Sequence, residues 1–496
     1  MQAQLIILIA YVAILLAISW WSTLLLKKGT ANKTLNYLLA GRNLPTVLVC
    51  VMLVGLAVGG ASTVGVAQRA YKDGFSAGWY NAAWGLGGIF VGLFVARHLR
   101  RMTVKTIPQI MGQMFGPYTR FISVICQLLV MISITALQYV AGGSILAALL
   151  PDVFTFTQGM MASAAIFIFI TLFGGYWASG LTNLFNVVVI YAGIVIALAF
   201  SVDHFGGFGT LMATLPQGQD WFHPISGLGL ATVAGFVAVM VTMATTTQAV
   251  SQICFAAKDE ARARNGFLLG GILILPAGFL CAVFGIMAAA KFPGLDAKEA
   301  AKALPMLVTE LSPAVGGFFL ASLWAADIST AVGLLMGCST LVLEDVVKKV
   351  YHKPLEGSRE LLVSRIVVLV VSLLSFALAL TVVGILQTIT TALALTTSFT
   401  FLLLAGIYFP GLLRRKTGFW VVLASLILWI IWTFFPSLRV FPELIYAEWL
   451  VCGTIIIGFA AFASEPAGSL FARSRALDEE EAAAASLPEG QAAPTP

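Results

Sequence analysis

Charged residues are scarce in this chain. Asp, Glu, Lys and Arg make up 10% of its 496 residues, whereas hydrophobic residues make up 59%. A soluble globular domain carries about 25% charged residues, because its surface must be solvated. This scarcity argues against a soluble enzyme or binding module, and we predict an all-α polytopic membrane protein.

Long apolar runs fill most of the sequence. A helix needs about 20 apolar residues to cross roughly 30 Å of hydrocarbon. Thirteen such runs occur, near residues 4–26, 44–68, 76–96, 121–150, 157–176, 179–201, 226–254, 266–290, 312–343, 362–386, 388–412, 418–436 and 443–464. Runs of this length fit membrane helices rather than the shorter strands of a barrel.

Signatures of several other protein classes are missing. The six cysteines form no CxxC pair and lie in apolar runs, which indicates buried thiols rather than a disulfide framework. The four histidines are scattered, so they do not indicate a metal cluster. We find no nucleotide-binding loop or catalytic constellation, and we expect neither an enzyme nor a cofactor. The first run lacks the basic start and cleavage site of a signal peptide, so we expect it to be retained.

The distribution of positive charge predicts the topology. Most of the 28 lysines and arginines fall on one side of the membrane if the N-terminus lies outside and the C-terminus lies in the cytoplasm. This topology accounts for the net charge of +6 without a nucleic-acid partner. We therefore expect a multi-pass protein of the plasma membrane, the inner membrane of a bacterium, with residues 465–496 as a disordered cytoplasmic tail.

The second run contains a cluster of small residues near its middle. Gly55, Gly59 and Gly60 are followed by Ser62 and Thr63, and three glycines over six residues weaken a helix. Unwound backbone is tolerated in a membrane where it lines a cavity, and its free carbonyls can then coordinate a cation. Close helix packing through small residues is the alternative, and the local sequence leaves both open.

The seventh run contains a polar stretch, "VTMATTTQAVSQ", with Gln248 and Gln252 one helical turn apart. A primary amide in hydrocarbon costs several kcal/mol unless it finds partners. The two glutamines therefore predict a polar cavity near the midplane. For the threonines and the serine of this stretch, bonding back to their own helix is the structural alternative.

The ninth run contains one charged residue. Asp327, in "WAADIST" (324–330), is the only Asp, Glu, Lys, Arg or His between Leu311 and Leu343. Ser329 and Thr330 lie on the same half of a helix that advances about 100° per residue. An ionisable group at the midplane costs roughly 2.5–3.5 kcal/mol and is functional by default. The structural alternative is a protonated or salt-bridged aspartate that holds helices together.

Five motifs occur in one order along the chain: "NYLLAGRNLP" (36–45), "AYKDG" (70–74), "GGYWASGLTNLFN" (174–186), "QICFAAKDEARARNG" (252–266) and "AADISTAVGLLMGCSTLVLEDVVKK" (325–349). In these motifs the sequence resembles the sodium/solute symporters over about residues 1–465. The resemblance implies a LeuT-type core of 5+5 helices in inverted repeats, with one extra N-terminal and two extra C-terminal helices. The first helix of each repeat, here the second and the seventh run, would be broken.

The resemblance implies a division of the chain. It places an N-terminal helix and loop at 1–43, the first repeat at 44–203, an extracellular loop at 204–225, the second repeat at 226–412 and two final helices at 413–464, before the tail at 465–496. One monomer would be sufficient for transport.

The resemblance also implies a sodium site. Its ligands would be the carbonyls of Gly55, Val58 and Ala326 and the side-chain oxygens of Ser329 and Thr330. Many relatives carry an aspartate where this chain has Asn183, so both Asn183 and Asp327 are candidates for ion coupling. Because relatives with a second sodium carry hydroxyls one turn beyond the main pair, where this chain has Val332 and Gly333, we expect one sodium ion per solute.

The solute is expected to lie between the two broken helices. The candidate contacts are Ala57, Ser62, Thr63, Trp79, Asn81, Trp84, Met243, Thr247 and Gln248. Sugar-carrying relatives place a Tyr-Trp pair where this chain has Met243 and Ala244, so a carboxylate- or amino-acid-like solute is favoured over a sugar.

The expected function is sodium-coupled secondary active symport of a small organic solute into the cell by alternating access. Two alternatives remain. One is a proton-coupled symporter that uses Asp327, since this acid stands alone in its helix. The other is a membrane solute sensor that acts through a separate partner.

Overall fold

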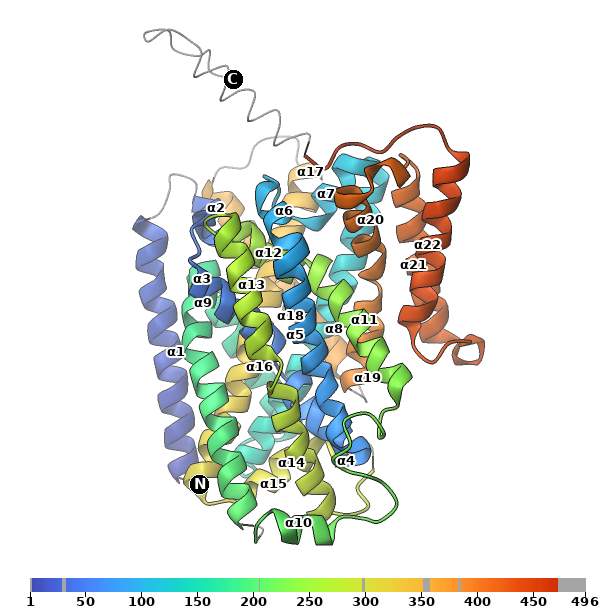
Figure 1. Ribbon diagram of the computed structural model, residues 1–496. Helices are drawn as coiled ribbons and strands as arrows, with labels where there is room; N and C mark the ends of the chain where they lie inside the picture. The colour runs from blue at the N-terminus through green and yellow to red at the C-terminus, as the bar shows by residue number, and fades with distance from the viewer. Residues whose placement is uncertain are drawn as a thin grey trace.

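The chain folds into helices that run side by side through most of the molecule. The computed structural model describes residues 2–28, 33–204, 206–296, 299–350, 357–381 and 385–471. In these residues the regular elements are helices, accompanied by two isolated bridges, Leu44 to Ala257 and Arg414 to Pro466. Figure 1 shows α1 at one flank of the bundle, and α21 and α22 at the other.

The helices of the first half are α1 (Gln2–Lys28), α2 (Lys33–Leu39), η1 (Ala40–Arg42), α3 (Thr46–Ala57), η2 (Ala61–Gly65), α4 (Val66–Asp73), η3 (Gly74–Gly78), α5 (Trp79–Phe90), η4 (Val91–Val95), α6 (Ala96–Arg101), α7 (Ile107–Phe115), α8 (Pro117–Leu149), α9 (Phe156–His204) and α10 (Phe208–Thr214). Those of the second half are α11 (Leu230–Thr246), α12 (Gln248–Ala256), α13 (Glu260–Ile274), α14 (Ala277–Lys291), η5 (Glu299–Lys302), α15 (Ala303–Thr309), α16 (Pro313–Leu341), η6 (Val342–Val347), α17 (Lys348–Val350), α18 (Gly357–Ala379), α19 (Ile385–Ala394), α20 (Thr397–Tyr408), η7 (Pro410–Leu412), α21 (Thr417–Phe434), η8 (Pro436–Leu438) and α22 (Leu444–Phe462).

Each of the thirteen apolar runs contains described helical residues, although fewer helices qualify as spans by length and composition. Ten described helices are long and apolar enough to cross a membrane, or eleven if α11 and α12 count as one bent span. The second run does not qualify by itself, because it breaks after Ala57 and its second half continues into the third run as Ala61–Arg101. The fifth run is the shorter apolar helix Phe156–Leu172.

A change of direction inside α9 separates the fifth and sixth runs. Gly175 has φ 57° and ψ −151° there, a conformation that side chains disfavour. The close approach of another helix adds to this requirement, because a β-carbon on Gly175 would lie 2.6 Å from Tyr37 Cδ2 and 2.8 Å from its carbonyl oxygen. The first motif of the sequence therefore packs directly on the third.

The ninth run forms the centre of the bundle. Of the ten described spans, Pro313–Val347 is the most buried, at 89% of its apolar window. It packs against α1, α3, α8, α9 and α18, so Asp327 lies in protein rather than in lipid. The predicted tail is described only to Phe471, and there the Gly468 N–H donates to Met114 O at 2.8 Å. Residues 472–496 lie outside the described part.

Candidate functional site

The second run breaks at its glycines. Helix α3 ends at Ala57, and Val58 leaves the helical region with φ −95° and ψ 78°. The N–H groups of Ser62 and Thr63 both donate to Gly59 O, at 3.0 and 3.1 Å, so Ser62 does not bond Val58 O as an unbroken helix would require. The break therefore takes the carbonyl of Val58 out of the helical ladder.

Four oxygens meet beside this break. Ser329 Oγ lies 2.8 Å from Gly55 O and 2.7 Å from Ala326 O, and Thr330 Oγ1 lies 2.9 and 3.3 Å from the same two atoms. A hydroxyl has one hydrogen and can donate to one acceptor at a time. The oxygens outnumber the donors, and a cation would satisfy the surplus lone pairs. We call Gly55 O, Ala326 O, Ser329 Oγ and Thr330 Oγ1 the oxygen cluster.

The seventh run breaks one residue before Gln248. Helices α11 and α12 meet at 48°, and Thr247 between them is extended at φ −63° and ψ 130°. The hydroxyl oxygen of Thr247 is buried without a hydrogen-bond partner in the described residues. The two helices expected to break thus both do so, near the middle of their runs.

One helix caps both breaks. Gln138 of α8 accepts the Gly60 N–H on Oε1 at 2.9 Å, and Gln127 of the same helix accepts the Gln248 N–H on Oε1 at 3.0 Å. Gln127 also donates to Thr246 O at 2.8 Å. Eleven residues make about three turns, so both amides lie on one face of α8. Each glutamine satisfies a backbone donor that the break would otherwise leave without a partner.

A small central cavity lies between the breaks. It leaves about 30 Å³ to water and is lined by Leu56, Ala57, Gly59, Ala61, Tyr80, Trp84, Ile134, Gln138, Met243, Thr247, Ala249, Val250, Thr330, Leu334, Ile389 and Leu393. None of these described lining residues is charged. A second cavity of about 770 Å³ lies beyond it, lined by residues that include Gly65, Lys72, Trp221 and Pro293.

Four of the nine predicted solute contacts line the central cavity: Ala57, Trp84, Met243 and Thr247. Ser62 and Thr63 do not, because their hydroxyls donate back to Ala57 O and Gly59 O across the break. Serine and threonine hydroxyls in membrane helices commonly bond to their own backbone in this way.

The other three predicted contacts lie elsewhere. Trp79 donates through Nε1 to Pro224 O at 2.9 Å in the loop before α11. Asn81 faces α14, since a β-carbon on Gly278 would lie 2.8 Å from Asn81 Cβ. Gln248 points away from the cavity, where its Oε1 accepts the Ile107 N–H at 2.9 Å and its Nε2 donates to Lys105 O at 3.0 Å. None of the three lines the central cavity. Trp79 and Gln248 bond to the backbone, whereas neither polar atom of the Asn81 side chain has a hydrogen-bond partner in the described residues.

The asparagines of the sixth run lie next to the oxygen cluster. A β-carbon on Gly55 would come within 2.7 Å of Asn183 Cγ, so Asn183 packs directly on the first broken helix. Its Oδ1 has no hydrogen-bond partner in the described residues. Asn186 donates to Ala325 O at 3.3 Å and accepts from Tyr11 at 2.9 Å. Asn183 is therefore a neutral neighbour of the cluster.

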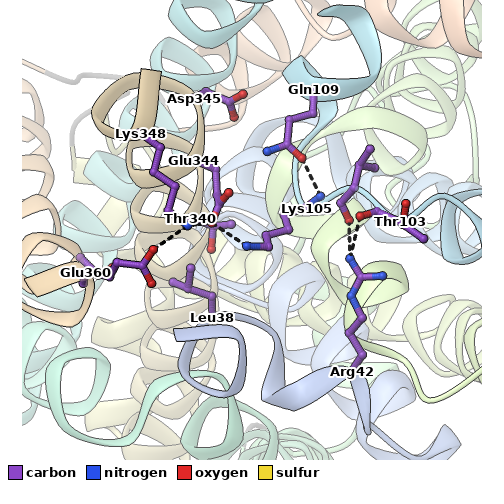
Figure 2. A network of polar contacts seen from close by, with 12 residues as sticks. Leu38, Arg42, Thr103, Lys105, Gln109, Thr340, Glu344, Asp345, Lys348 and Glu360 are labelled. Atoms are coloured by element: carbon purple, nitrogen blue, oxygen red, sulfur yellow. Dashed lines mark hydrogen bonds and ion pairs between the residues drawn. The ribbon is translucent and has the colours of Figure 1, made fainter. Parts of the chain in front are cut away.

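Ion pairs join several segments at one end of the molecule. We call this end, which holds Lys105, Glu344, Lys348 and Glu360, the basic end. Glu344 pairs with Lys105 at 2.8 Å and with Lys348 at 2.9 Å, and Lys348 also pairs with Glu360 at 2.8 Å. Figure 2 shows these side chains converging from separate elements. Burial lowers the pKa of Lys348, but its hydrogen bonds to Glu360 and Glu344 outweigh this, and the pKa lies above its usual value. The lysine therefore stays charged between its two acids.

Hydrogen bonds of two glutamine side chains also connect segments at this end. Gln252 donates to Leu38 O and to Thr340 Oγ1, both at 2.8 Å. Gln248 Nε2 donates to Lys105 O, as described above. The two glutamines that predicted a polar cavity thus tie α12 to three other segments at the basic end.

Sequence reasoning missed Tyr80, Gln127 and Gln138. The two glutamines carried a usable signal, because an amide inside an apolar run needs a partner, as was argued for Gln248. Tyr80 carried no such signal: its fully buried ring lines the cavity only because of how α5 packs.

Comparisons with known proteins agree on one family. A family model described as the sodium:solute symporter family matches residues 37–424. A sodium/proline symporter of Staphylococcus aureus is 25% identical over 86% of this chain and 86% of its own length. The high-affinity proline transporter PutP of Bacillus subtilis is 23% identical over 71% and 76%. The sodium/glucose cotransporter 4 of Danio rerio is 25% identical over 75% of this chain, which spans 62% of that relative.

Solved structures agree on the fold. A Na+-coupled sialic acid symporter in a substrate-bound outward-open state superimposes with a TM-score of 0.75, at 15% identity, over 94% of this chain and 98% of that one. Mhp1, a nucleobase-cation-symport-1 family transporter in a closed conformation, gives 0.60 at 14% identity, over 89% and 97%. The expectation of a LeuT-type all-α membrane fold is confirmed.

Proposed function

The chain belongs to the sodium:solute symporter family, and we propose on this basis that it carries a small organic solute across the plasma membrane together with sodium. The observation that supports this most directly is the oxygen cluster at the first break. Carbonyl and hydroxyl oxygens suit a hard cation that must bind and then leave. Since the relatives of this chain are secondary transporters, the sodium gradient rather than a chemical reaction drives transport.

The proposed sodium ligands are the oxygen cluster and the carbonyl of Val58. They belong to two helices that are far apart in the sequence, so a bound ion would link the first broken helix to α16. Ser329 and Thr330 are 2% and 3% exposed, and the site is therefore shielded from water. Binding is expected to hold the two helices together, and ion release to free them.

The proposed solute is small and partly apolar. The central cavity presents the rings of Tyr80 and Trp84 and the thioether of Met243, with the unpartnered hydroxyl of Thr247 as a polar contact. This lining supports an amino-acid- or carboxylate-like solute over a sugar, which needs several polar anchors. The two bacterial relatives named for proline support the same class. The Gly60 N–H, bonded to Gln138, is not available to a carboxylate.

We propose that this conformation is closed toward the cytoplasm. The ion pairs and amide bonds of the basic end support this. The orientation with the N-terminus outside remains our proposal, and so does the division into two repeats at 44–203 and 226–412. We further propose that a monomer is sufficient, because the cluster and the cavity lie within one chain.

The test is uptake by the purified protein in liposomes. A thermal-shift screen with small carboxylates, amino acids, vitamins and sugars, each with and without sodium, selects the solute to be used. Uptake of that solute is expected to follow an inward sodium gradient and to stop when potassium replaces sodium. Uptake that follows a pH gradient and ignores sodium would refute the proposal in favour of proton coupling.

A further inference from the structure

The carboxylate of Asp327 is buried without a partner. Its side chain is 0% exposed, and neither oxygen has a hydrogen-bond partner in the part of the chain that the structure describes. It takes part in none of the ion pairs found there. The Gly60 N–H lies close to it but is directed at Gln138. A buried ion without a counter-charge is costly, by several kcal/mol even after relaxation.

Two glycines let this carboxylate pack closely against the first broken helix and α8. A β-carbon on Gly60 would collide with Asp327 Oδ1, and one on Gly142 of α8 would lie 3.4 Å from Oδ2 and 2.5 Å from Ser163 Oγ. The Ser163 oxygen is held in place because it accepts from Trp324 Nε1 at 2.9 Å. We call Gly60, Gly142, Ser163 and Asp327 the Asp327 niche. It combines one negative charge with a neutral oxygen.

The niche lies beside the oxygen cluster but uses different atoms. On a helix that advances about 100° per residue, Asp327 points about 160° away from Ser329 and about 60° away from Thr330. Ser329 meets the first broken helix at Gly55 and Thr330 meets it at Gly55 and Gly59, whereas Asp327 meets it at Gly60. The carboxylate therefore faces a different part of the broken helix.

The niche is also separate from the solute space. None of its four residues lines the central cavity, although their neighbours Gly59, Ala61 and Thr330 do. A charged group of the solute would have to pass behind Gly60 to reach the carboxylate. A small inorganic cation fits this position better than the solute does.

We propose that the Asp327 niche is a second sodium site. The carboxylate supplies the charge, Ser163 supplies a neutral oxygen, and both are ligands that hard cations prefer. The inference rests on the proposed sodium coupling and adds an ion to it, so that two sodium ions accompany each solute instead of the one expected from the sequence. The negative charge that many relatives carry at the position of Asn183 is then supplied from α16.

The experiment counts sodium ions directly and needs no knowledge of the solute. Equilibrium binding of radioactive sodium to the purified full-length protein is expected to saturate at two ions per chain. Asp327→Asn keeps the size of the side chain and removes its charge, and it is expected to lower the count to one. Ser329→Ala weakens the oxygen cluster alone, so the ion in the niche is expected to remain and to bind with wild-type affinity.

Matched controls separate loss of the site from general damage. Glu448 of α22 is another fully buried carboxylate and accepts from Ser425 at 2.6 Å, so Glu448→Gln is expected to keep two ions. Gly142→Ala fills the niche without touching its charge and is expected to leave one ion. Gly143→Ala points its new methyl at Met160 and is expected to keep two.

The outcomes are distinguishable. One ion in the wild type, or two in Asp327→Asn, overturns the second site while leaving sodium coupling intact. An ion lost equally in Glu448→Gln also overturns it, because the loss would then not be specific to the niche. No saturable sodium binding in the wild type overturns the proposed function itself.

Discussion

Within the ninth run, neighbouring residues have different partners. Ser329 and Thr330 reach the carbonyl of Gly55 across a sequence separation of more than 270 residues. Asp327, two residues before Ser329, turns to Gly60 and α8 instead. The hydroxyls can be replaced without altering a charge, and the carboxylate can be neutralised without altering the cluster. Each role can therefore be tested by itself.

Ser329→Ala is expected to weaken sodium activation of transport. The change removes one oxygen ligand, and an interaction with a charged group is worth about 1.5–3 kcal/mol, or roughly 10- to 150-fold in the half-saturating sodium concentration. The measurement is uptake as a function of sodium in liposomes. Ser322→Ala is the control, because within the described residues this buried serine of the same helix bonds to Phe319 O alone. Equal sodium dependence in both variants would contradict the assignment.

At this scale the sequence predicted residue types better than residue contacts. The cluster was expected from the family resemblance, and in the structure Ser329 Oγ and Thr330 Oγ1 lie 2.7–3.3 Å from Gly55 O and Ala326 O. Gln248 was expected in the solute cavity, because an amide in an apolar run needs polar partners. The partners exist, but they lie at the basic end. The sequence shows that a buried amide needs a partner, but it does not show on which side of the helix that partner lies.

At the scale of elements, α8 connects the two broken helices. Gln127 and Gln138 cap the second halves of both from one face of this helix. A motion of either broken helix must therefore break, or carry with it, a bond to α8. This arrangement makes the two glutamines positioning residues, because they act on the backbone of the breaks and only Gln138 also lines the cavity.

Gln127→Leu is expected to slow transport without changing solute affinity. It leaves the Gln248 N–H and Thr246 O unsatisfied in a buried place, at a cost of about 1–3 kcal/mol each, and it disturbs the break that must move. The expected result is a lower maximal rate at a nearly unchanged half-saturating solute concentration. Gln127→Glu can still accept from Gln248 and should restore part of the rate. A variant that loses affinity with its rate intact would instead place Gln127 at the solute.

The length of the apolar runs identified the helices, and the glycines made a break in the second run one of two alternatives, which the structure decided. The second break lacks a glycine and occurs at Thr247. Its position depends on tertiary partners: the Gln248 N–H donates to Gln127 Oε1, and the Gln248 side chain donates to Lys105 O. Local propensity could not have located it, since threonine and glutamine are both tolerated in helices.

At the scale of the whole molecule, the basic end and the opposite end differ. At the basic end, ion pairs and an amide bond join the segment before α7, and helices α8, α12 and α18, to the end of α16 with η6 and α17. Figure 2 shows part of these contacts. The opposite end carries a cavity of about 770 Å³ and fewer such contacts, whereas a cavity of about 620 Å³ lies beside the ion pairs of the basic end. Alternating access requires the first set of contacts to open, so their strength should set how often the protein faces the basic side.

Glu344→Gln is expected to open the basic end more often. Glu344 is 8% exposed and holds two lysines, so its loss leaves both partly buried cations without that partner. The measurement is the labelling rate of Cys254, fully buried in α12, by an impermeant thiol reagent in a variant whose other cysteines are removed. The rate should rise several-fold.

Arg101→Ala is the matched control for that variant. Its ion pair with Glu260 belongs to the same end, but the side chains are 59% and 38% exposed, and exposed pairs contribute little, about 0–1 kcal/mol. Labelling of Cys254 should therefore stay at the wild-type rate. Equal labelling in both variants would mean that the buried network does not hold this end closed.

The sequence alone determined the class of the protein, its helices and the family, because hydrophobic length and ordered motifs are local properties of the chain. Only the tertiary structure decided which polar groups meet. It placed Ser329 and Thr330 on Gly55, Asp327 against Gly60 and Gly142, and Gln248 at the basic end. In a protein this apolar, each buried polar atom must find a partner or an ion. Which one it finds depends on packing between distant helices, and that information is not contained in any single run.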